Sequence, residues 1–223
     1  TLYSLDYMSH EGHENRFFGF WIASFGVVLG VAFAEDFLTL YFFYELLTLA
    51  TLPLVMHFMD EKARYAGREY LVFSLSGAAF AFIGIVYLLH YSATLDFTYG
   101  GVLDLALAAG HEPALQAVFV LAFFGFGVKA AIFPFYKWLP DASVAPTPVS
   151  ALLHAVAVVK AGAFAVLRLI YFGFGADFLR GTPAQSIVMT AAIVTIIYGS
   201  ARALRTPHLK RRLAFSTVSN LSY

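Results

Sequence analysis

Long apolar runs separated by short polar segments make up most of the chain. A helix that crosses the roughly 30 Å hydrocarbon core of a bilayer needs about 20 mostly apolar residues, whereas a membrane β-strand needs about 10 alternating ones. The runs have the longer length and do not alternate, so they predict helices. We expect a further span to begin near Leu213, after six complete transmembrane helices at about 17–34, 37–58, 70–89, 115–135, 149–172 and 184–203.

The composition supports a membrane protein and excludes several other classes. Hydrophobic residues make up 60% of the 223 residues and charged residues 13%, whereas a soluble domain carries about 25% charged residues. So few charges exclude a soluble fold, a nucleic-acid binder and a disordered tail. The formal net charge is zero and cysteine is absent, so steering by net charge, disulfides and iron–sulfur clusters are excluded as well. The predicted fold class is an all-α polytopic membrane helix bundle.

The first 16 residues are polar and lack the basic-then-apolar order of a signal peptide. We expect a single transmembrane domain over 1–223, in which 1–16 is a polar segment on the cytoplasmic side. Because the sequence does not begin with Met and a span starts near its C-terminal end, we also expect it to be a fragment of a longer protein.

Basic residues outside the expected spans divide unevenly between the two sides of the membrane. One side has only Arg180, against six acidic residues: Glu35, Asp36, Asp96, Asp104, Glu112 and Asp177. Basic residues mark the cytoplasmic side, so we expect the other side to face the cytoplasm, in an energy-coupling membrane such as the plasma membrane of a bacterium or archaeon. That side carries ten basic residues: Arg16, Lys62, Arg64, Arg68, Lys137, Arg202, Arg205, Lys210, Arg211 and Arg212.

Five ionisable residues lie inside the expected spans: Glu45, Lys129, His154, Lys160 and Arg168. An ionised group at mid-bilayer costs on the order of 3 kcal/mol, so such groups face a partner or a wet cavity. Glu45 has no cation within two turns of its own run, so its partner must lie on another helix. One interpretation is a static Glu45–Lys129 pair that only fixes packing. Three cations and a histidine in one small bundle favour an ion pathway instead.

Two prolines lie beside the buried charges. Pro134 cannot donate a hydrogen bond to the Ala130 carbonyl, and Pro53 cannot donate one to the Leu49 carbonyl. These prolines predict that the helices are bent or broken beside Lys129 and beside Glu45. Interrupted helices next to buried charges are typical of ion routes in transporters.

His154 and Lys160 belong to the run expected to start as a helix near Val149. On a regular helix they are about 240° apart around the axis and about 9 Å apart along it, so they would face different neighbours. Such an arrangement suits a proton handed from one side of the helix to the other. For His154 the alternative is a packing role near the interface, and Arg168 reads as an anchor or accessory charge nearer the acidic side.

No other motif indicates chemistry in this chain. The segment 10–14 contains two histidines and two glutamates, but their spacing does not place metal ligands on one helical face. We find no nucleophile–base pair, haem-ligand pair or nucleotide-binding motif in the sequence. We therefore expect no metal, no cofactor and no catalytic site, with any redox chemistry on partner chains.

Several segments resemble the antiporter-like proton-translocating subunits of respiratory complex I, Mrp-type cation/proton antiporters and membrane-bound hydrogenases. The resemblance covers about residues 17–223, and the stretch HAVAVVKAG at 154–162 is closer to the Mrp and hydrogenase members. The segments that carry it are FFYELLTL at 42–49, GVKAA at 127–131, WLPDA at 138–142, APTPVSALL at 145–153 and LKRRLAFSTVS at 209–219.

The resemblance implies a fold with broken helices in two inverted five-helix repeats. This chain would hold one repeat, from about family helix four to the start of helix ten. It also implies that Glu45 and Lys129 form the family's buried Glu–Lys pair and that His154 and Lys160 lie on its relay helix. The implied partners are lipid and the other membrane subunits of a large complex, including homologous antiporter-like subunits.

These observations predict a proton-translocating subunit driven by a redox partner or by counter-ion flux. Whether it belongs to an oxidoreductase or to an antiporter stays open at this point. A second hypothesis is Na⁺/H⁺ exchange by an Mrp-type antiporter, although the sequence places no sodium site. A third is a membrane scaffold whose buried charges hold partner subunits without transport.

Overall fold

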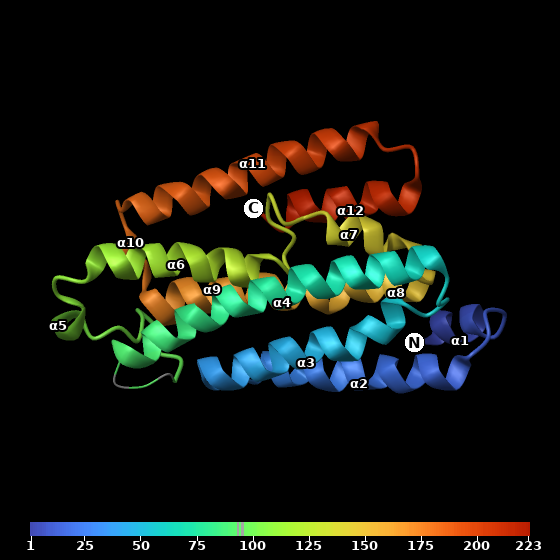
Figure 1. Ribbon diagram of the computed structural model, residues 1–223, viewed down its shortest axis with the longest axis horizontal. Coiled ribbons are helices and arrows are strands. Elements are labelled where there is room, and N and C mark those ends of the chain that lie inside the picture. Colours follow the sequence, from blue (N-terminus) through green and yellow to red (C-terminus); the bar gives the residue numbers. More distant parts are fainter. Residues whose placement is uncertain (93, 95) are drawn as a thin grey trace.

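The computed structural model describes residues 1–92, 94 and 96–223 (Figure 1). Every regular element within these residues is a helix, which confirms the predicted all-α class. The longer helices are α1 (Leu2–Met8), α2 (Glu14–Ala32), α3 (Phe37–Val55), α4 (Glu61–His90), α6 (Glu112–Gly127), α9 (Val158–Arg168), α11 (Pro183–Arg205) and α12 (Leu209–Asn220). The short elements are α5 (Leu105–Ala108), α7 (Trp138–Asp141), η1 (Ala142–Val144), α8 (Thr147–Ala151), η2 (Leu152–Val156), η3 (Leu169–Phe174) and α10 (Ala176–Leu179).

Five helices in the described part of the chain are long and apolar enough to cross a membrane: α2, α3, α4, the continuous stretch Thr147–Phe174, and α11. They confirm five of the six expected spans. The remaining expected span, 115–135, is only partly helical, because α6 ends at Gly127. Where the further span was expected, the structure has α12, a helix of 12 residues that begins at Leu209 and is not among these five.

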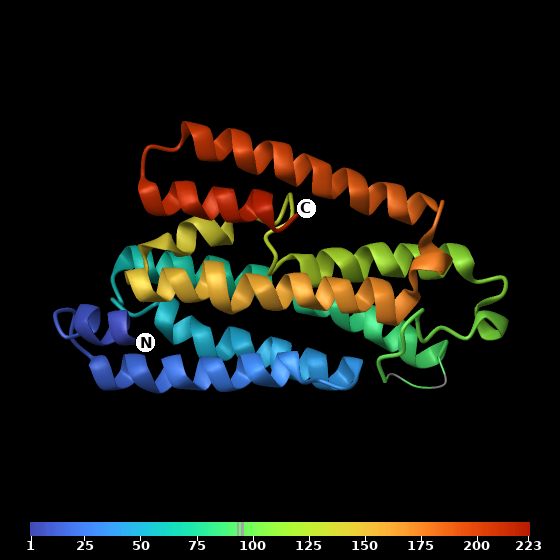
Figure 2. The same ribbon diagram turned by 180° about the vertical axis from the view of Figure 1, so that it is seen from behind.

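The helices alternate in direction between two ends of the bundle (Figures 1 and 2). The main pairs of packed helices are α2 with α3, α4 with α6, and α11 with α12. At one end α2, α4 and α12 begin and α3 and α11 end (Figure 1). We call this the Arg/Lys-rich end, because these termini carry Arg16, Lys62, Arg64, Arg68, Arg202, Arg205, Lys210, Arg211 and Arg212.

Small residues bring α4 and α6 into close contact. A Cβ atom added to Gly125 of α6 would clash with the backbone nitrogen of Ala81 on α4. One added to Gly84 of α4 would clash with the Cβ atom of Ala122 on α6. Small side chains permit this backbone approach, which is how membrane helices gain packing energy without a hydrophobic driving force. The contact fixes the last turns of α6 next to α4.

The chain leaves the helical path where α6 ends. Residues 128–137 follow without helix, and Ala131 has a left-handed φ of 59°. The predicted interruption near Pro134 is confirmed, but it begins before Lys129 and not after it. The predicted break at Pro53 is wrong, since α3 continues through that residue to Val55. Pro53 lies in the last turn of α3, where a missing donor removes one hydrogen bond and leaves no following turns to bend.

The stretch from α8 to η3 contains turns that the sequence did not predict. Its helix begins at Thr147, close to the expected start near Val149. A π-helical turn, η2, follows, in which the Ala157 nitrogen donates to the Leu152 carbonyl at 2.8 Å. A π turn inserts an extra residue into the helix. The regular-helix angle expected between His154 and Lys160 is therefore wrong for this chain.

Candidate functional site

Glu45 and Lys129 form an ion pair inside the bundle. Glu45 lies in the middle of α3, and Lys129 lies just past the end of α6. The Lys129 Nζ atom donates to the Glu45 Oε1 atom at 3.0 Å. The side chain of Lys129 is 1% exposed and that of Glu45 is 20% exposed. The structure thus supplies the partner from outside α3, as the sequence required, although Lys129 lies on the non-helical segment after α6 and not on a helix.

Tyr44, the residue before Glu45, gives Lys129 two further contacts. Its carbonyl oxygen accepts a hydrogen bond from the Lys129 Nζ atom, and its ring centroid lies 3.4 Å from the same atom. A desolvated cation over an aromatic ring is stabilised by the ring's negative face. The Tyr44 hydroxyl donates to the Phe126 carbonyl at 2.9 Å, so it also satisfies a carbonyl in the last turn of α6.

The non-helical segment after α6 is held by side chains from distant parts of the sequence. The Trp138 indole nitrogen donates to the Val128 carbonyl at 2.8 Å. The Phe133 backbone nitrogen donates to the hydroxyl of the buried Thr195, on α11, at 3.0 Å. Backbone groups at membrane depth persist outside a helix only when protein or a water-filled cavity satisfies them. Because these bonds satisfy the backbone, Lys129 can lie on a non-helical segment at membrane depth.

Gly162 allows α9 to pack directly against this stretch. A Cβ atom on Gly162 would lie 2.5 Å from the Ala130 nitrogen and 2.8 Å from the Lys129 carbonyl carbon. Contacts this close to backbone atoms cannot be relieved by turning a side chain. The absence of a side chain at this position places the backbone of α9 beside that of Lys129.

His154 and Lys160 have fewer polar contacts with the described residues than Glu45 and Lys129 have. His154 is half-buried on η2, and its two ring nitrogens have no hydrogen-bond partner among the described residues. Lys160 is exposed on α9. In the part of the chain that the structure describes, no hydrogen bond or ion pair joins either residue to Glu45 or Lys129. The structure therefore brings only two of the four predicted pathway residues into direct polar contact.

Arg168 ends α9 among aromatic rings. Its guanidinium carbon lies 4.6 Å from the ring centroid of Phe97, 4.9 Å from that of Phe164 and 4.5 Å from that of Phe172. Stacking on aromatic faces suits the planar guanidinium group. This setting agrees with the anchoring interpretation of Arg168.

Lys137 closes the non-helical segment at the protein surface. Its Nζ atom donates to the Tyr65 hydroxyl at 3.0 Å and to the Glu69 carboxylate at 3.1 Å. These two bonds, first that of Tyr65, raise the pKa of Lys137 above its ordinary value. Lys137 therefore stays protonated and fastens the segment to α4.

The other titratable residues give no metal site among the described residues, where no three His, Cys, Asp or Glu side chains come together. His10 and His13 are exposed, near the turn between α1 and α2. They lie at the surface, away from the buried pair.

Sequence reasoning missed Tyr44, Trp138, Thr195 and Gly162 as parts of the site. Tyr44 was detectable, because it adjoins a buried glutamate within the segment that carries the family resemblance. Thr195 gave no signal, since a threonine in an apolar helix usually bonds to its own backbone. Thr195 does so too, donating to the Ala191 carbonyl at 2.6 Å while it accepts from Phe133.

Comparisons with known proteins agree with this geometry. Residues 34–223 match the family described as "NADH:quinone oxidoreductase/Mrp antiporter, TM". The chain is 37% identical over 225 residues to an Na(+)/H(+) antiporter subunit of Bacillus subtilis (strain 168), and 37% identical over 224 residues to the corresponding protein of Alkalihalophilus pseudofirmus. Each alignment covers 99% of this chain and 27% of the relative, so the chain spans about a quarter of these proteins.

Two solved structures share the arrangement of helices. The Mrp complex from Dietzia sp. DQ12-45-1b contains a chain that superposes with a TM-score of 0.76 at 29% identity, covering 93% of this chain and 22% of that one. The archaeal membrane-bound sulfane sulfur reductase gives a TM-score of 0.74 at 24% identity, covering 91% and 41%, and supports the fold alone. The chain is an integral membrane protein and belongs to the NADH:quinone oxidoreductase/Mrp antiporter membrane family.

Proposed function

We propose that this chain is the proton-translocating part of an antiporter-like protein in a multi-subunit membrane complex. The observation that carries the proposal is the Glu45–Lys129 ion pair, in which Lys129 is buried and Glu45 is partly buried, inside a membrane bundle and beside an interrupted helix. Buried charges are costly in a bilayer, and a break next to them gives the site freedom to move.

The pair would work as a switch for one proton. The Glu45 carboxylate stabilises the ammonium form of Lys129, and opening the pair removes that stabilisation. A change of about 1.4 kcal/mol in pairing energy alters proton affinity about tenfold, so a small movement suffices. The released proton would pass through water to His154, whose ring nitrogens have no hydrogen-bond partner among the described residues, or to Lys160, exposed on α9, after that lysine has given up its own proton.

The relatives favour counter-ion exchange as the driving event. Two of them are named as Na(+)/H(+) antiporter subunits, so exchange of protons for sodium in an Mrp-type complex is the form we favour. A redox-driven pump is the second candidate, because the matching family also includes NADH:quinone oxidoreductase subunits. In either case we propose other membrane subunits as partners, among them homologous antiporter-like chains.

The orientation belongs to the same proposal. The Arg/Lys-rich end of the bundle would face the cytoplasm, because basic residues near helix ends are retained on that side. The membrane would be the plasma membrane of a bacterium or archaeon, and proton uptake would then begin at the Arg/Lys-rich end.

The test is proton flux through the assembled complex in membrane vesicles. We expect Lys129→Ala to abolish proton movement driven by a sodium gradient, while Arg180→Ala, at an exposed position on the opposite end, leaves it unchanged. Replacing sodium by choline separates sodium exchange from redox-driven pumping. Undiminished flux in an assembled Lys129→Ala complex would overturn the proposal.

A further inference from the structure

A group of hydroxyls lies between the ion pair and the Arg/Lys-rich end. The hydroxyls of Thr51, on α3, and Tyr70, on α4, are hydrogen-bonded at 2.8 Å, and both residues are fully buried. Thr48, one turn closer to Glu45 on α3, and Ser74, one turn beyond Tyr70 on α4, are also buried. We call Thr48, Thr51, Tyr70 and Ser74 the hydroxyl cluster.

Two members of the hydroxyl cluster lack a protein partner. The hydroxyl oxygens of Thr48 and Ser74 form no hydrogen bond with any described residue. A buried polar group without a partner costs about 1–3 kcal/mol, and buried water is the usual way in which proteins satisfy such groups. Glu45 precedes Thr48 by three residues, so the two side chains lie on the same face of α3 and the hydroxyl cluster adjoins the ion pair.

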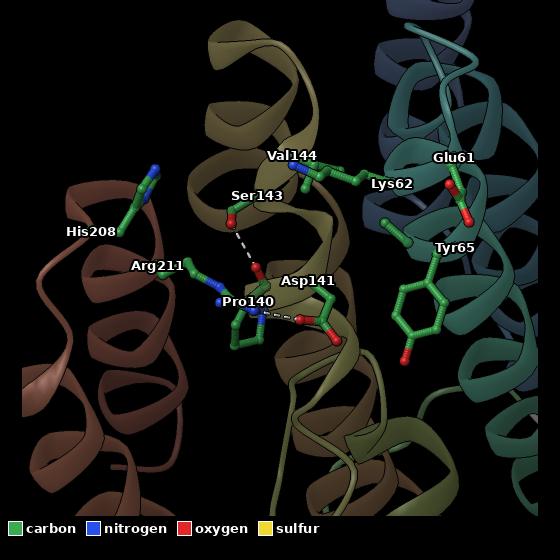
Figure 3. Close-up of a pocket in the computed structure, with 10 residues that line it drawn as sticks. Glu61, Lys62, Tyr65, Pro140, Asp141, Ser143, Val144, His208 and Arg211 are labelled. Carbon is green, nitrogen blue, oxygen red and sulfur yellow. Dashed lines mark hydrogen bonds and ion pairs between the residues drawn. The ribbon is translucent and has the colours of Figure 1, made fainter.

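An ionic cavity opens at the Arg/Lys-rich end of this region (Figure 3). Its volume is about 750 Å³. Arg211 bonds to Asp141 at 2.8 Å on one wall, and Glu61 and Tyr65 of α4 form the opposite wall (Figure 3). The lining thus contains two carboxylates, those of Glu61 and Asp141, and the imidazole of His208.

The cavity lining and the hydroxyl cluster occupy neighbouring turns of α4. Ala66, which lines the cavity, precedes Tyr70 by four residues on α4, a distance of about 6 Å along a helix. Pro140, which also lines it, follows Trp138 by two residues, and the Trp138 and Tyr70 rings pack 5.1 Å apart. Trp138 in turn bonds to the Val128 carbonyl, next to Lys129. The path from the cavity thus runs along α4 to the hydroxyl cluster and from there along α3 to Glu45.

We propose that the hydroxyl cluster is the proton-uptake relay of this chain, taking protons from the cavity and delivering them to Glu45. The inference rests on the proposed function and adds to it the residues that load the pair. It assigns Thr51 and Tyr70 as the relay's central hydroxyls, with water held between Thr48 and Ser74.

The relay conserves protons at each step. The Tyr70 hydroxyl oxygen takes up a proton from cavity water as it passes its own proton to the Thr51 oxygen. The Thr51 hydroxyl then turns its proton away from the Leu47 carbonyl, to which it donates at 2.7 Å, and passes it onward, so neither group changes its charge. The proton ends on the Glu45 carboxylate, which becomes neutral, and Lys129 loses its counter-charge. After Lys129 has given its proton toward His154 or Lys160, the proton on Glu45 moves to Lys129 and restores the pair.

The test compares variants of the hydroxyl cluster in the assembled complex. A positioned proton-transfer group contributes about 10²–10⁴-fold in enzymes, and water can replace part of a lost hydroxyl, so we expect Thr51→Val and Tyr70→Phe each to slow proton transport about tenfold. Thr51→Ser, which keeps the hydroxyl, should restore the rate. The slow variants should also lose rate more steeply than the parent when pH rises on the side of the cavity, because uptake has become limiting.

The matched control is Tyr87→Phe, which removes a hydroxyl from an exposed position on α4, and complex yield is measured for every variant. Parental rates in Thr51→Val and Tyr70→Phe, together with an inactive Lys129→Ala, would overturn the relay and leave the proposed function standing. An equally slow Thr51→Ser would also overturn it, because the loss would then come from packing. Full activity in Lys129→Ala would instead overturn the proposed function.

Discussion

The two regions that carry the buried ionisable residues differ in how completely the described chain surrounds them. Around Lys129, helix α3 supplies a carboxylate, a carbonyl and an aromatic ring. Around His154, the described residues supply no hydrogen-bond partner, and Lys160 of the same stretch is exposed. One region is a complete ion pair, and the other holds two ionisable side chains without hydrogen-bond partners among the described residues.

This difference indicates a division of roles. A proton on Lys129 is held until the pair opens, because three groups stabilise the ammonium. The π-helical turn that carries His154 is a local irregularity of the kind often found at functional sites, and such a turn can change the direction of a side chain at low cost. In the proposed function, the paired region would store a proton and the unpaired region would receive it.

The largest effect should come from removing the carboxylate. Glu45→Ala leaves Lys129 as an uncompensated buried charge, and breaking a buried pair in this way costs about 3–5 kcal/mol. We expect thermal unfolding of the complex in detergent at a clearly lower temperature, together with loss of proton transport. A variant as stable as the parent would show that Lys129 is neutral or finds another partner.

A smaller effect is expected where the two regions touch. Gly162→Ala would force the α9 backbone away from Ala130 and Lys129, and overpacking of this kind costs about 1–3 kcal/mol. The matched control is Gly26→Ala on α2, where an added Cβ atom meets nothing within 4 Å. Equal stability of the two variants in thermal unfolding would contradict the close contact between α9 and the non-helical segment after α6.

The unpaired region should separate stability from transport. Lys160→Gln changes an exposed position, so we expect the free energy of unfolding to stay within about 0.5 kcal/mol of the parent. Proton flux should nevertheless fall, because the acceptor is lost. Unchanged flux in vesicles would remove Lys160 from the pathway and leave His154 as the acceptor.

The smallest effect concerns His57, which lies just beyond the end of α3. Burial, and then the nearby Arg16 guanidinium, lower the pKa of His57 below its ordinary value. The unfolded chain therefore binds the proton more readily than the folded one, so this contribution to stability is present above about pH 6.5 and is lost as pH falls below it. We expect unfolding temperature to fall less between pH 7 and pH 5 in His57→Gln than in the parent. Equal falls would show that His57 is protonated in the folded protein.

The sequence predicted the paired region better than the unpaired one for a physical reason. A charge inside an apolar run, such as Glu45 or Lys129, stands out in the chain because of its transfer cost. The π turn at Leu152–Val156 has no such mark, since it contains neither proline nor glycine. The end of α6 at Gly127 depends on bonds from Trp138 and Thr195, and Thr195 is remote in sequence.

Pro53 illustrates the opposite error. A proline predicts a break by its missing donor, but its effect depends on how many turns follow it. Pro53 is followed by only two helical residues in α3. Pro53 does not break α3 because the helix ends two residues later, and tertiary packing sets the position of that end.

The most direct test of the storage role of the Glu45–Lys129 pair is proton flux in the double variant Glu45→Gln/Lys129→Met, compared with both single variants in assembled complexes of equal yield. The double variant removes both charges together, so neither charge is left without its partner. Its stability should therefore be higher than that of the single variants. Our account predicts that it assembles well and moves no protons. Proton transport at the parental rate in the double variant would contradict the account and identify the pair as a scaffold.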